Sequence, residues 1–316
     1  MAINEVHIRE GLLVRRFGVA KAILETFEKG IYVNDAANRK AGIVGQHYGA
    51  EEKLHEEKPK SKWAEVDPVL RAKLINRTSY NKHTDLNGDF TESRQLLHGN
   101  IIKKITDVKP QAKPHAILLL GGGASGKSHV WKTMVKPDLK NGEQYAYLNN
   151  DDIKEELPEY KRYQAVDAPS AAARVHDESR AITKMVLRNL KNSKKNFVYD
   201  ATLNDYDKAL ALAKELKGLG YKVEMVGVIV DEKTARTNAK LRYERSGRAV
   251  PDYILTSAQK GARRTFYKLE KYNRAEFSNM TLYNNDGSLE NKPPLKIYEN
   301  GKQLDEEKYA MVKQYH

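Results

Sequence analysis

The chain has 316 residues, of which 40% are apolar and 31% charged, and its formal net charge is +13. This length and composition are ordinary for a globular protein of one or two domains with a substantial core. The absence of cysteine excludes disulfides, thiol nucleophiles and cysteine-ligated metal sites. No apolar run is long enough to span a bilayer, and the N-terminus lacks the apolar core of a secretory signal, so we expect a cytoplasmic protein with no membrane partner.

The first 90 residues predict a mostly helical extension of unknown role. Apolar residues recur at helical spacing in residues 11–31, a charged stretch at 49–68 is typical of a linker or exposed arm, and 67–80 suits a short helix. The apolar face of the first helix would consist of Leu12, Val14, Val19, Ile23, Leu24 and Phe27. The excess of basic residues forms no tail, which disfavours nucleic acid as a direct partner.

From residue 91 to 316, strands and helices alternate. Apolar runs predict strands at 116–120, 146–148, 196–200 and 222–230, and helical periodicity predicts helices at 170–192, 205–220, 232–245 and 252–273. The pair Asn300-Gly301 predicts a tight hairpin within 296–304. This alternation indicates an α/β fold of the P-loop NTPase or kinase type, with a parallel sheet flanked by helices and joined to the mostly helical N-terminal extension.

A glycine-rich loop follows the first predicted strand. The residues GGGASGKS match the pattern G-x-x-x-x-G-K-[ST], between an apolar strand and a helix start. Its glycines let backbone N–H groups approach phosphate oxygens, Lys127 reaches the β- and γ-phosphates, and Ser128 supplies a hydroxyl to Mg²⁺. We therefore expect ATP or GTP with Mg²⁺, bound by Gly121, Gly122, Gly123, Ala124, Ser125, Gly126, Lys127 and Ser128.

Two acidic positions follow later predicted strands. Asp200 ends the strand at 196–200, where a P-loop protein places an acid near the metal, although a helix N-cap would use the same residue type. Asp151 and Asp152 follow the strand at 146–148 and would face the same crevice, because ligands bind beyond the carboxyl ends of parallel strands. One of these carboxylates could accept the proton of an acceptor hydroxyl, and simple helix N-capping is the alternative.

Arginines gather around Gly247. Arg242, Arg245 and Arg248 lie where one helix ends and another restarts after Pro251, which is typical of a lid that neutralises charge on a transferring phosphoryl group. Ordinary surface arginines at a helix end are the alternative. His176, in contrast, has no neighbours at metal-ligand spacing, and we expect it to be a packing residue with satisfied hydrogen bonds.

The ordered set of motifs resembles the zeta toxin family of P-loop kinases. The matching segments are TESRQLLHGNII, ILLLGGGASGKS, YLNNDDIKEELPEY, VHDESRAITK, NFVYDAT, VGVIVD and RYERSGRAVPDYIL, which together cover about residues 90 to 290. One departure is Ala201, where the family has a glycine.

The resemblance implies a role for each matching position. Zeta-type enzymes phosphorylate a sugar hydroxyl of UDP-N-acetylglucosamine from ATP or GTP. Asp151 would be the general base, Lys127 and Ser128 would bind phosphate and Mg²⁺, and Arg242 and Arg248 would clamp phosphate. The resemblance also places Asp200 and Thr202 beside the acceptor. It implies, in addition, a possible antitoxin or inhibitory protein as a partner.

The sequence thus favours a small-molecule kinase that transfers the γ-phosphoryl group to a hydroxyl, with a nucleotide sugar as the leading acceptor. Two alternatives stay open. The basic net charge allows a polynucleotide kinase or another nucleic-acid-acting NTPase, whose binding would depend strongly on salt. A nucleotide-stabilised binding module would show nucleotide-dependent melting without turnover.

Overall fold

The computed structural model describes residues 78–85, 88–139, 143–246, 250 and 252–314. The predicted helix at 11–31, the stretch at 49–68 and most of the helix expected at 67–80 lie outside these residues. Within the described part of the chain, no helix is both long and apolar enough to cross a membrane.

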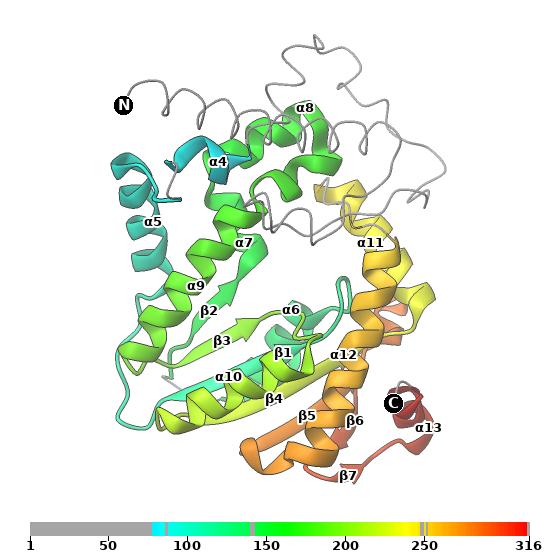
Figure 1. Ribbon diagram of the computed structural model, residues 1–316. Helices are drawn as coiled ribbons and strands as arrows, with labels where there is room; N and C mark the ends of the chain where they lie inside the picture. The colour runs from blue at the N-terminus through cyan, green and yellow to red at the C-terminus, as the bar shows by residue number, and fades with distance from the viewer. Residues whose placement is uncertain (1–77, 86–87, 140–142, 247–249, 251, 315–316) are drawn as a thin grey trace, which may run out of the picture.

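The core of the protein is one sheet, in which the described residues form seven strands in the order β2-β3-β1-β4-β5-β6-β7 (Figure 1). Strands β1 to β5 run parallel to one another, whereas β6 pairs antiparallel with β5 and β7 pairs antiparallel with β6. Their bounds are β1 His115–Leu120, β2 Ala146–Asn149, β3 Phe197–Asp200, β4 Lys222–Ile229, β5 Asn279–Asn284, β6 Leu295–Glu299 and β7 Lys302–Gln303. The loop after β1 therefore opens among the carboxyl ends of five parallel strands, where open α/β sheets bind their ligands.

Alternate residues of β1 point to opposite faces of the sheet and enter two separate parts of the core. Leu118 belongs to the larger part, which is covered by α5 (Glu92–Ile105), α9 (His176–Asn192), α10 (Tyr206–Gly218), α12 (Asp252–Asn273) and α13 (Glu306–Lys313). Leu119 belongs to the smaller part on the other face, beneath α6 (Lys127–Val130) and the π-helical turn Trp131–Val135. Because both faces are buried, the strand is the continuous apolar run that the sequence shows.

The remaining elements connect or flank these layers. The helices are α4 Ser79–His83, α7 Asn150–Glu156, α8 Pro158–Arg174 and α11 Glu232–Ser246, and short 3₁₀ turns occupy Lys136–Asp138, Arg274–Glu276 and Asp286–Glu290. The expected hairpin joins β6 and β7, and both of its turn residues have positive φ, +48° at Asn300 and +93° at Gly301. These values are those of a type I′ turn, the form favoured by Asn-Gly.

Several details differ from the sequence prediction. Helices α5 and α13 and the part of α8 before residue 170 were not predicted, and two further differences have a local cause. The single helix expected at 170–192 is two helices, because the chain breaks at Val175, which has φ −107° and ψ 2° and lies fully buried. Strand β5 was not predicted, because its sequence NMTLYN mixes polar and apolar residues and lacks the continuous apolar run of β1. The other predicted strands and helices agree with the structure to within a few residues at their ends.

A buried ionic cluster joins the helices that precede β1 to α8 and α9. The guanidinium of Arg94 on α5 donates to Glu178 at 2.5 Å and to Glu159 at 2.6 Å. His98 and His83 donate to the same two carboxylates, at 2.7 Å and 2.8 Å. Burial alone would raise the pKa of Glu178, but hydrogen bonds from His98 and Arg94 outweigh it and lower that pKa to about 2.

This cluster spans the predicted boundary near residue 90. His83 on α4 lies before the boundary and Arg94 on α5 lies after it, yet both bind Glu159. The described end of the predicted extension is thus packed against the sheet-bearing part of the chain. The division into residues 1–90 and 91–316 stays a prediction.

Replacement of Arg94 by methionine should destabilise the protein strongly, because it leaves the Glu159 and Glu178 carboxylates buried without their main cation. We expect a loss of about 3–5 kcal/mol in the free energy of unfolding, measured by urea denaturation. Lys104→Met is the matched control, since its ion pair with Glu156 is exposed and should be worth less than about 1 kcal/mol. Equal losses in the two variants would contradict the proposed importance of burial.

Candidate active site

The glycine-rich loop runs from Gly121 at the end of β1 to Ser128 in α6, as the sequence predicts. Two of its glycines are required by the geometry. A Cβ at Gly121 would lie 2.5 Å from the carbonyl oxygen of Val228, and Gly126 has φ +86° with a Cβ position 2.2 Å from the amide of Asn285. Both positions therefore exclude larger residues, one by close packing and the other also by its left-handed backbone.

Three side-chain amides hold the loop from outside through its carbonyl groups. Gln259 on α12 donates to the oxygen of Gly123 at 2.8 Å, and Asn285, just after β5, donates to that of Ser125 at 3.0 Å. Asn238 on α11 donates to the oxygen of Ala124 at 3.3 Å. The sequence did not identify these residues, because they come from distant segments and an amide side chain carries no local motif.

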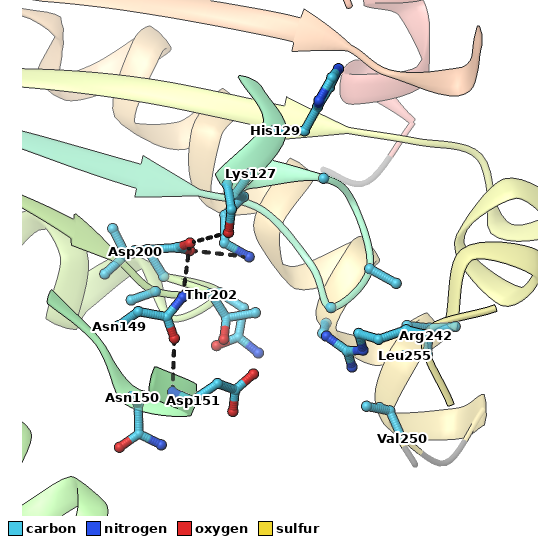
Figure 2. Close-up of a pocket in the computed structure, with 18 of the residues that line it drawn as sticks. Lys127, His129, Asn149, Asn150, Asp151, Asp200, Thr202, Arg242, Val250 and Leu255 are labelled. Carbon is cyan, nitrogen blue, oxygen red and sulfur yellow. Dashed lines mark hydrogen bonds and ion pairs between the residues drawn. The ribbon is translucent and has the colours of Figure 1, made fainter. Parts of the chain in front are cut away.

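The carboxylate of Asp200 is the centre of the hydrogen bonding beside this loop (Figure 2). Its Oδ2 accepts hydrogen bonds from Ser128 at 3.0 Å, Tyr147 at 2.5 Å and Asn149 at 3.0 Å. The Nζ of Lys127 lies 3.7 Å from Oδ1 and donates to the carbonyl of Gly121. Asp200 is not a helix N-cap, since α10 begins at Tyr206 and is capped by Asp205.

Tyr147 supports Asp200 from the neighbouring strand. Burial, together with the adjacent Asp200 carboxylate, raises the pKa of Tyr147 well above its ordinary value. The phenol therefore stays protonated and remains a hydrogen-bond donor to the carboxylate. Its ring stacks on Trp131, with centroids 6.1 Å apart, so the edge strand β2 and the segment after the loop hold it in place.

The residues beside the loop fit Mg²⁺. In the described part of the chain, no three His, Cys, Asp or Glu side chains gather into a metal cluster. Mg²⁺ bound with a nucleotide needs fewer protein ligands, because it keeps several waters and takes phosphate oxygens. The hydroxyl of Ser128 lies 3.0 Å from the carboxylate of Asp200, which places two hard oxygen donors together at the end of the loop.

Asp151 lies in the first turn of α7, directly after β2. Asn149 caps this helix, because its Oδ1 accepts a hydrogen bond from the backbone N–H of Asp151 at 2.7 Å. The amide nitrogen Nδ2 of the same Asn149 side chain donates to Asp200, so one amide group links the two acidic residues. Lys154 donates to the Asp151 carboxylate at 2.9 Å. Asp151 itself is thus not the N-cap.

The loop, Asp151 and Arg242 line one cavity of about 1460 Å³. Figure 2 shows Asp151 and Arg242 pointing into it from opposite walls, with Lys127 and Asp200 at its end and Thr202 between them and Asp151. The structure thus brings together every predicted site residue that it describes. Gly247 and Arg248 lie outside the described residues, so the arginine segment is represented here by Arg242 and Arg245.

His176 also borders this cavity, at the start of α9, with only 4% of its surface exposed. His176 is buried, as expected for a packing residue, but the prediction that its hydrogen bonds are satisfied is wrong. Neither ring nitrogen has a hydrogen-bond partner within the described structure. Burial, reinforced by the charges of Lys154 and Arg180, lowers the pKa of His176 to about 3, so the ring is neutral at neutral pH.

The model of the family described as zeta toxin matches residues 100–292, more than half of the chain. The chain belongs to the zeta toxin family. Toxin PezT of Streptococcus pneumoniae serotype 4 is 23% identical over 213 residues, which cover 63% of this chain and 81% of PezT.

Solved structures show the fold of this zeta toxin family member. A structure from the PezAT chromosomal toxin–antitoxin system of Streptococcus pneumoniae matches with a TM-score of 0.52 and 18% identity, covering 72% of this chain and 96% of that one. A crystal structure of AvrRxo1-ORF1 with AvrRxo1-ORF2 and ATP matches with a TM-score of 0.58 and 16% identity, covering 83% and 79%. The predicted α/β P-loop fold and the resemblance to the family are thereby confirmed.

Replacement of Gly121 by alanine should disrupt nucleotide binding, because the new methyl group would collide with the backbone of β4. We expect at least a tenfold loss of affinity for a fluorescent ATP analogue and a lower melting temperature. Gly99→Ala is the matched control, since Gly99 is exposed on α5 and a Cβ there meets nothing within 4 Å. That variant should bind normally and gain about 0.5–1 kcal/mol of stability.

Asp177 should make stability fall as pH rises. Burial raises its pKa to about 7, whereas an unfolded aspartate ionises near 3.9, so the folded state binds the extra proton between these values. Stability is lost through that window. The free energy of unfolding of Asp177→Asn, relative to that of the wild type, should therefore rise by at least about 1 kcal/mol between pH 5 and pH 8 in denaturant titrations. Asp207→Asn is the control, because Asp207 is exposed, and its difference from the wild type in free energy of unfolding should stay constant over this pH range. The same pH dependence in both variants would contradict the prediction.

Proposed function

We propose that this zeta toxin family member is a kinase that transfers the γ-phosphoryl group of ATP or GTP to a hydroxyl group of a small acceptor. The observation that supports this most directly is the shared cavity. Asp151 lies in the same cavity as the phosphate-binding loop, and Asn149 links it through hydrogen bonds to Asp200. A protein that only held a nucleotide would not need a fixed carboxylate beyond the position of the phosphates.

Asp151 would act as the general base. In this mechanism, the oxygen of the acceptor hydroxyl attacks the γ-phosphorus and Asp151 accepts its proton. The bond from the γ-phosphorus to the bridging oxygen breaks, and the nucleoside diphosphate leaves with the electron pair. The hydrogen bond that the backbone N–H of Asp151 donates to Asn149 and the ion pair with Lys154 fix the base at the carboxyl end of β2.

Lys127 and Arg242 would neutralise the charge of the transferring group from opposite sides. Lys127 belongs to the loop, and Arg242 points into the cavity from α11 (Figure 2). Arg248 would join them from the segment after α11. Mg²⁺ held by Ser128 and Asp200 would supply further positive charge at the phosphates. Fixed positive charges of this kind lower the activation free energy of phosphoryl transfer strongly, because they need no rearrangement during the reaction.

For the acceptor we propose a nucleotide sugar such as UDP-N-acetylglucosamine, with Asp200 and Thr202 beside it. The similarity to toxin PezT and the family match support this choice. We place the activity in the cytoplasm, where nucleoside triphosphates are supplied. Relatives of known structure come from a toxin–antitoxin system, which supports an antitoxin-like protein as an inhibitory partner.

Asp151→Asn should abolish phosphoryl transfer and leave ATP binding within twofold of the wild type, because asparagine keeps the shape of the side chain but cannot accept the proton. The loss should be at least 10²-fold, the usual contribution of a general base. The assay is transfer from labelled ATP to UDP-N-acetylglucosamine and a panel of nucleosides and dinucleotides, with products identified by mass.

Asp152→Asn is the matched control, since this neighbouring aspartate is exposed one position further around α7. It should retain most of the activity. Transfer by the wild type to no acceptor, despite bound nucleotide, would count against the kinase proposal. ATP-dependent melting without any product would then favour a binding module.

A further inference from the structure

A further cavity, of about 460 Å³, lies along β2, and we call it the edge cavity. Both faces of the strand contribute to its lining, because Ala146 belongs to the larger part of the core and Tyr147 packs against the smaller part on the opposite face. Successive side chains of a strand point to opposite faces, so a cavity that meets both runs along the edge of the strand. The other walls come from the second half of α5, the segment just after it, and α7: Ile101, Lys104, Ile105, Asp107, Val108, Asp152 and Glu156.

One side of the β2 backbone has no partner strand in the described part of the chain. On the other side lies β3, where the N–H of Ala146 donates to the carbonyl of Asn196 at 3.0 Å. Backbone groups alternate in direction along a strand, so the N–H and C=O of Tyr147 point to the side of the edge cavity. An extended segment is the ligand that pairs with a row of such groups.

The side chains around the edge cavity are apolar or charged. The apolar ones come from α5 and the segment after it: Ile101, Ile105 and Val108. The charged ones are one lysine and three acids, and Lys104 already binds Glu156 at 2.5 Å. The edge cavity is therefore negative in a chain whose formal net charge is +13. An occupant that carries both apolar and basic side chains would complement this lining.

The acidic lining also discriminates between possible occupants. A second copy of this chain, paired edge to edge through β2, would bring two sets of acidic side chains together, and like charges across such a pair are destabilising. Basic side chains of a different polypeptide would instead meet Asp107 and Glu156. Charged residues at the edge of a sheet are one of the means by which proteins avoid pairing with themselves.

We propose that the edge cavity is the docking site of an extended, basic segment of another polypeptide, which adds a strand to the sheet beside β2. The backbone of this segment pairs with that of Tyr147, and its apolar side chains pack against α5. Its lysine or arginine side chains lie beside Asp107 and Glu156. This inference goes beyond the proposed phosphoryl transfer and does not depend on it.

A segment docked at this edge would act on the active site through β2. Tyr147 and Asn149 both donate to Asp200, and Asn149 caps the helix that carries Asp151. Pairing on the second side of β2 raises the free-energy cost of opening the strand. The partner therefore stabilises the geometry of the site from outside the active-site cavity and leaves the glycine-rich loop accessible to a nucleotide.

The test measures fluorescence anisotropy with the full chain and three short labelled peptides. One alternates lysine and valine, one alternates glutamate and valine, and the third is the lysine–valine peptide with every peptide nitrogen methylated. We expect the first to bind at least tenfold more tightly than the others. Glutamate repeats the charge of the cavity, and the methyl groups remove the backbone donors. This binding should weaken as salt rises.

Hydrogen exchange locates the docked peptide. With the lysine–valine peptide bound, the amide hydrogens of residues 145–149 should exchange at least tenfold more slowly, because β2 is then paired on both sides. Strand β7 is the matched control, since it ends the described sheet at the opposite margin and should exchange at an unchanged rate.

The double variant Asp107→Asn, Glu156→Gln should bind the lysine–valine peptide about three- to thirtyfold more weakly, as expected for the loss of two exposed ion pairs. The double variant Glu92→Gln, Glu155→Gln is the matched control. It also removes two exposed acids, one from α5 and one from α7, but neither lines the edge cavity. Its affinity for the peptide should stay within twofold of the wild type.

Three results would overturn the inference: equal binding of the three peptides, unchanged exchange of residues 145–149, or equal affinities of the two double variants. A dimer of the free protein that the lysine–valine peptide dissociates would assign the edge to a second copy and also overturn it. A separate transfer assay isolates the proposed function. If the peptide docks at β2 but no acceptor is phosphorylated, the kinase proposal fails and the docking site stands.

Discussion

The buried carboxylate of Asp200 is the constraint on which the rest of the site depends. It ends β3, and its Oδ2 accepts hydrogen bonds from the glycine-rich loop after β1 and from two residues of β2. Three adjacent parallel strands are thereby held in register at the edge where their carboxyl ends meet. Because Asn149 also caps α7, the position of the proposed base is tied to the position of the proposed metal ligand.

Much of this arrangement could be predicted from the sequence, because it follows from local patterns. A continuous apolar run before GGGASGKS identifies β1, and the order of strands places the residues after β1, β2 and β3 at one edge. Asp151, Lys127 and Asp200 could be named for this reason. The break at Val175 could not, because a buried apolar residue fits the helical pattern on both sides of it.

Other features depend on contacts between distant segments. Gln259 and Asn285 hold the glycine-rich loop from α12 and from the end of β5, and neither stands in a motif that local spacing reveals. His176 was expected to have satisfied hydrogen bonds, yet its burial brings no partner within the described residues. Whether a buried polar atom finds a partner is decided by tertiary packing, which residue spacing alone does not give.

Strand β2 has only four residues and, among the strands that the structure describes, lies at the margin of the sheet, paired only with β3. Yet it carries Tyr147 and Asn149, both of which bind Asp200. Marginal strands exchange their amide hydrogens more readily than central ones, since they open at a lower free-energy cost. Heat or mild denaturant should therefore unfold β2 first, and with it the side of the pocket that carries Tyr147, Asn149 and Asp151. The central strand β1 should still hold its glycine-rich loop in place.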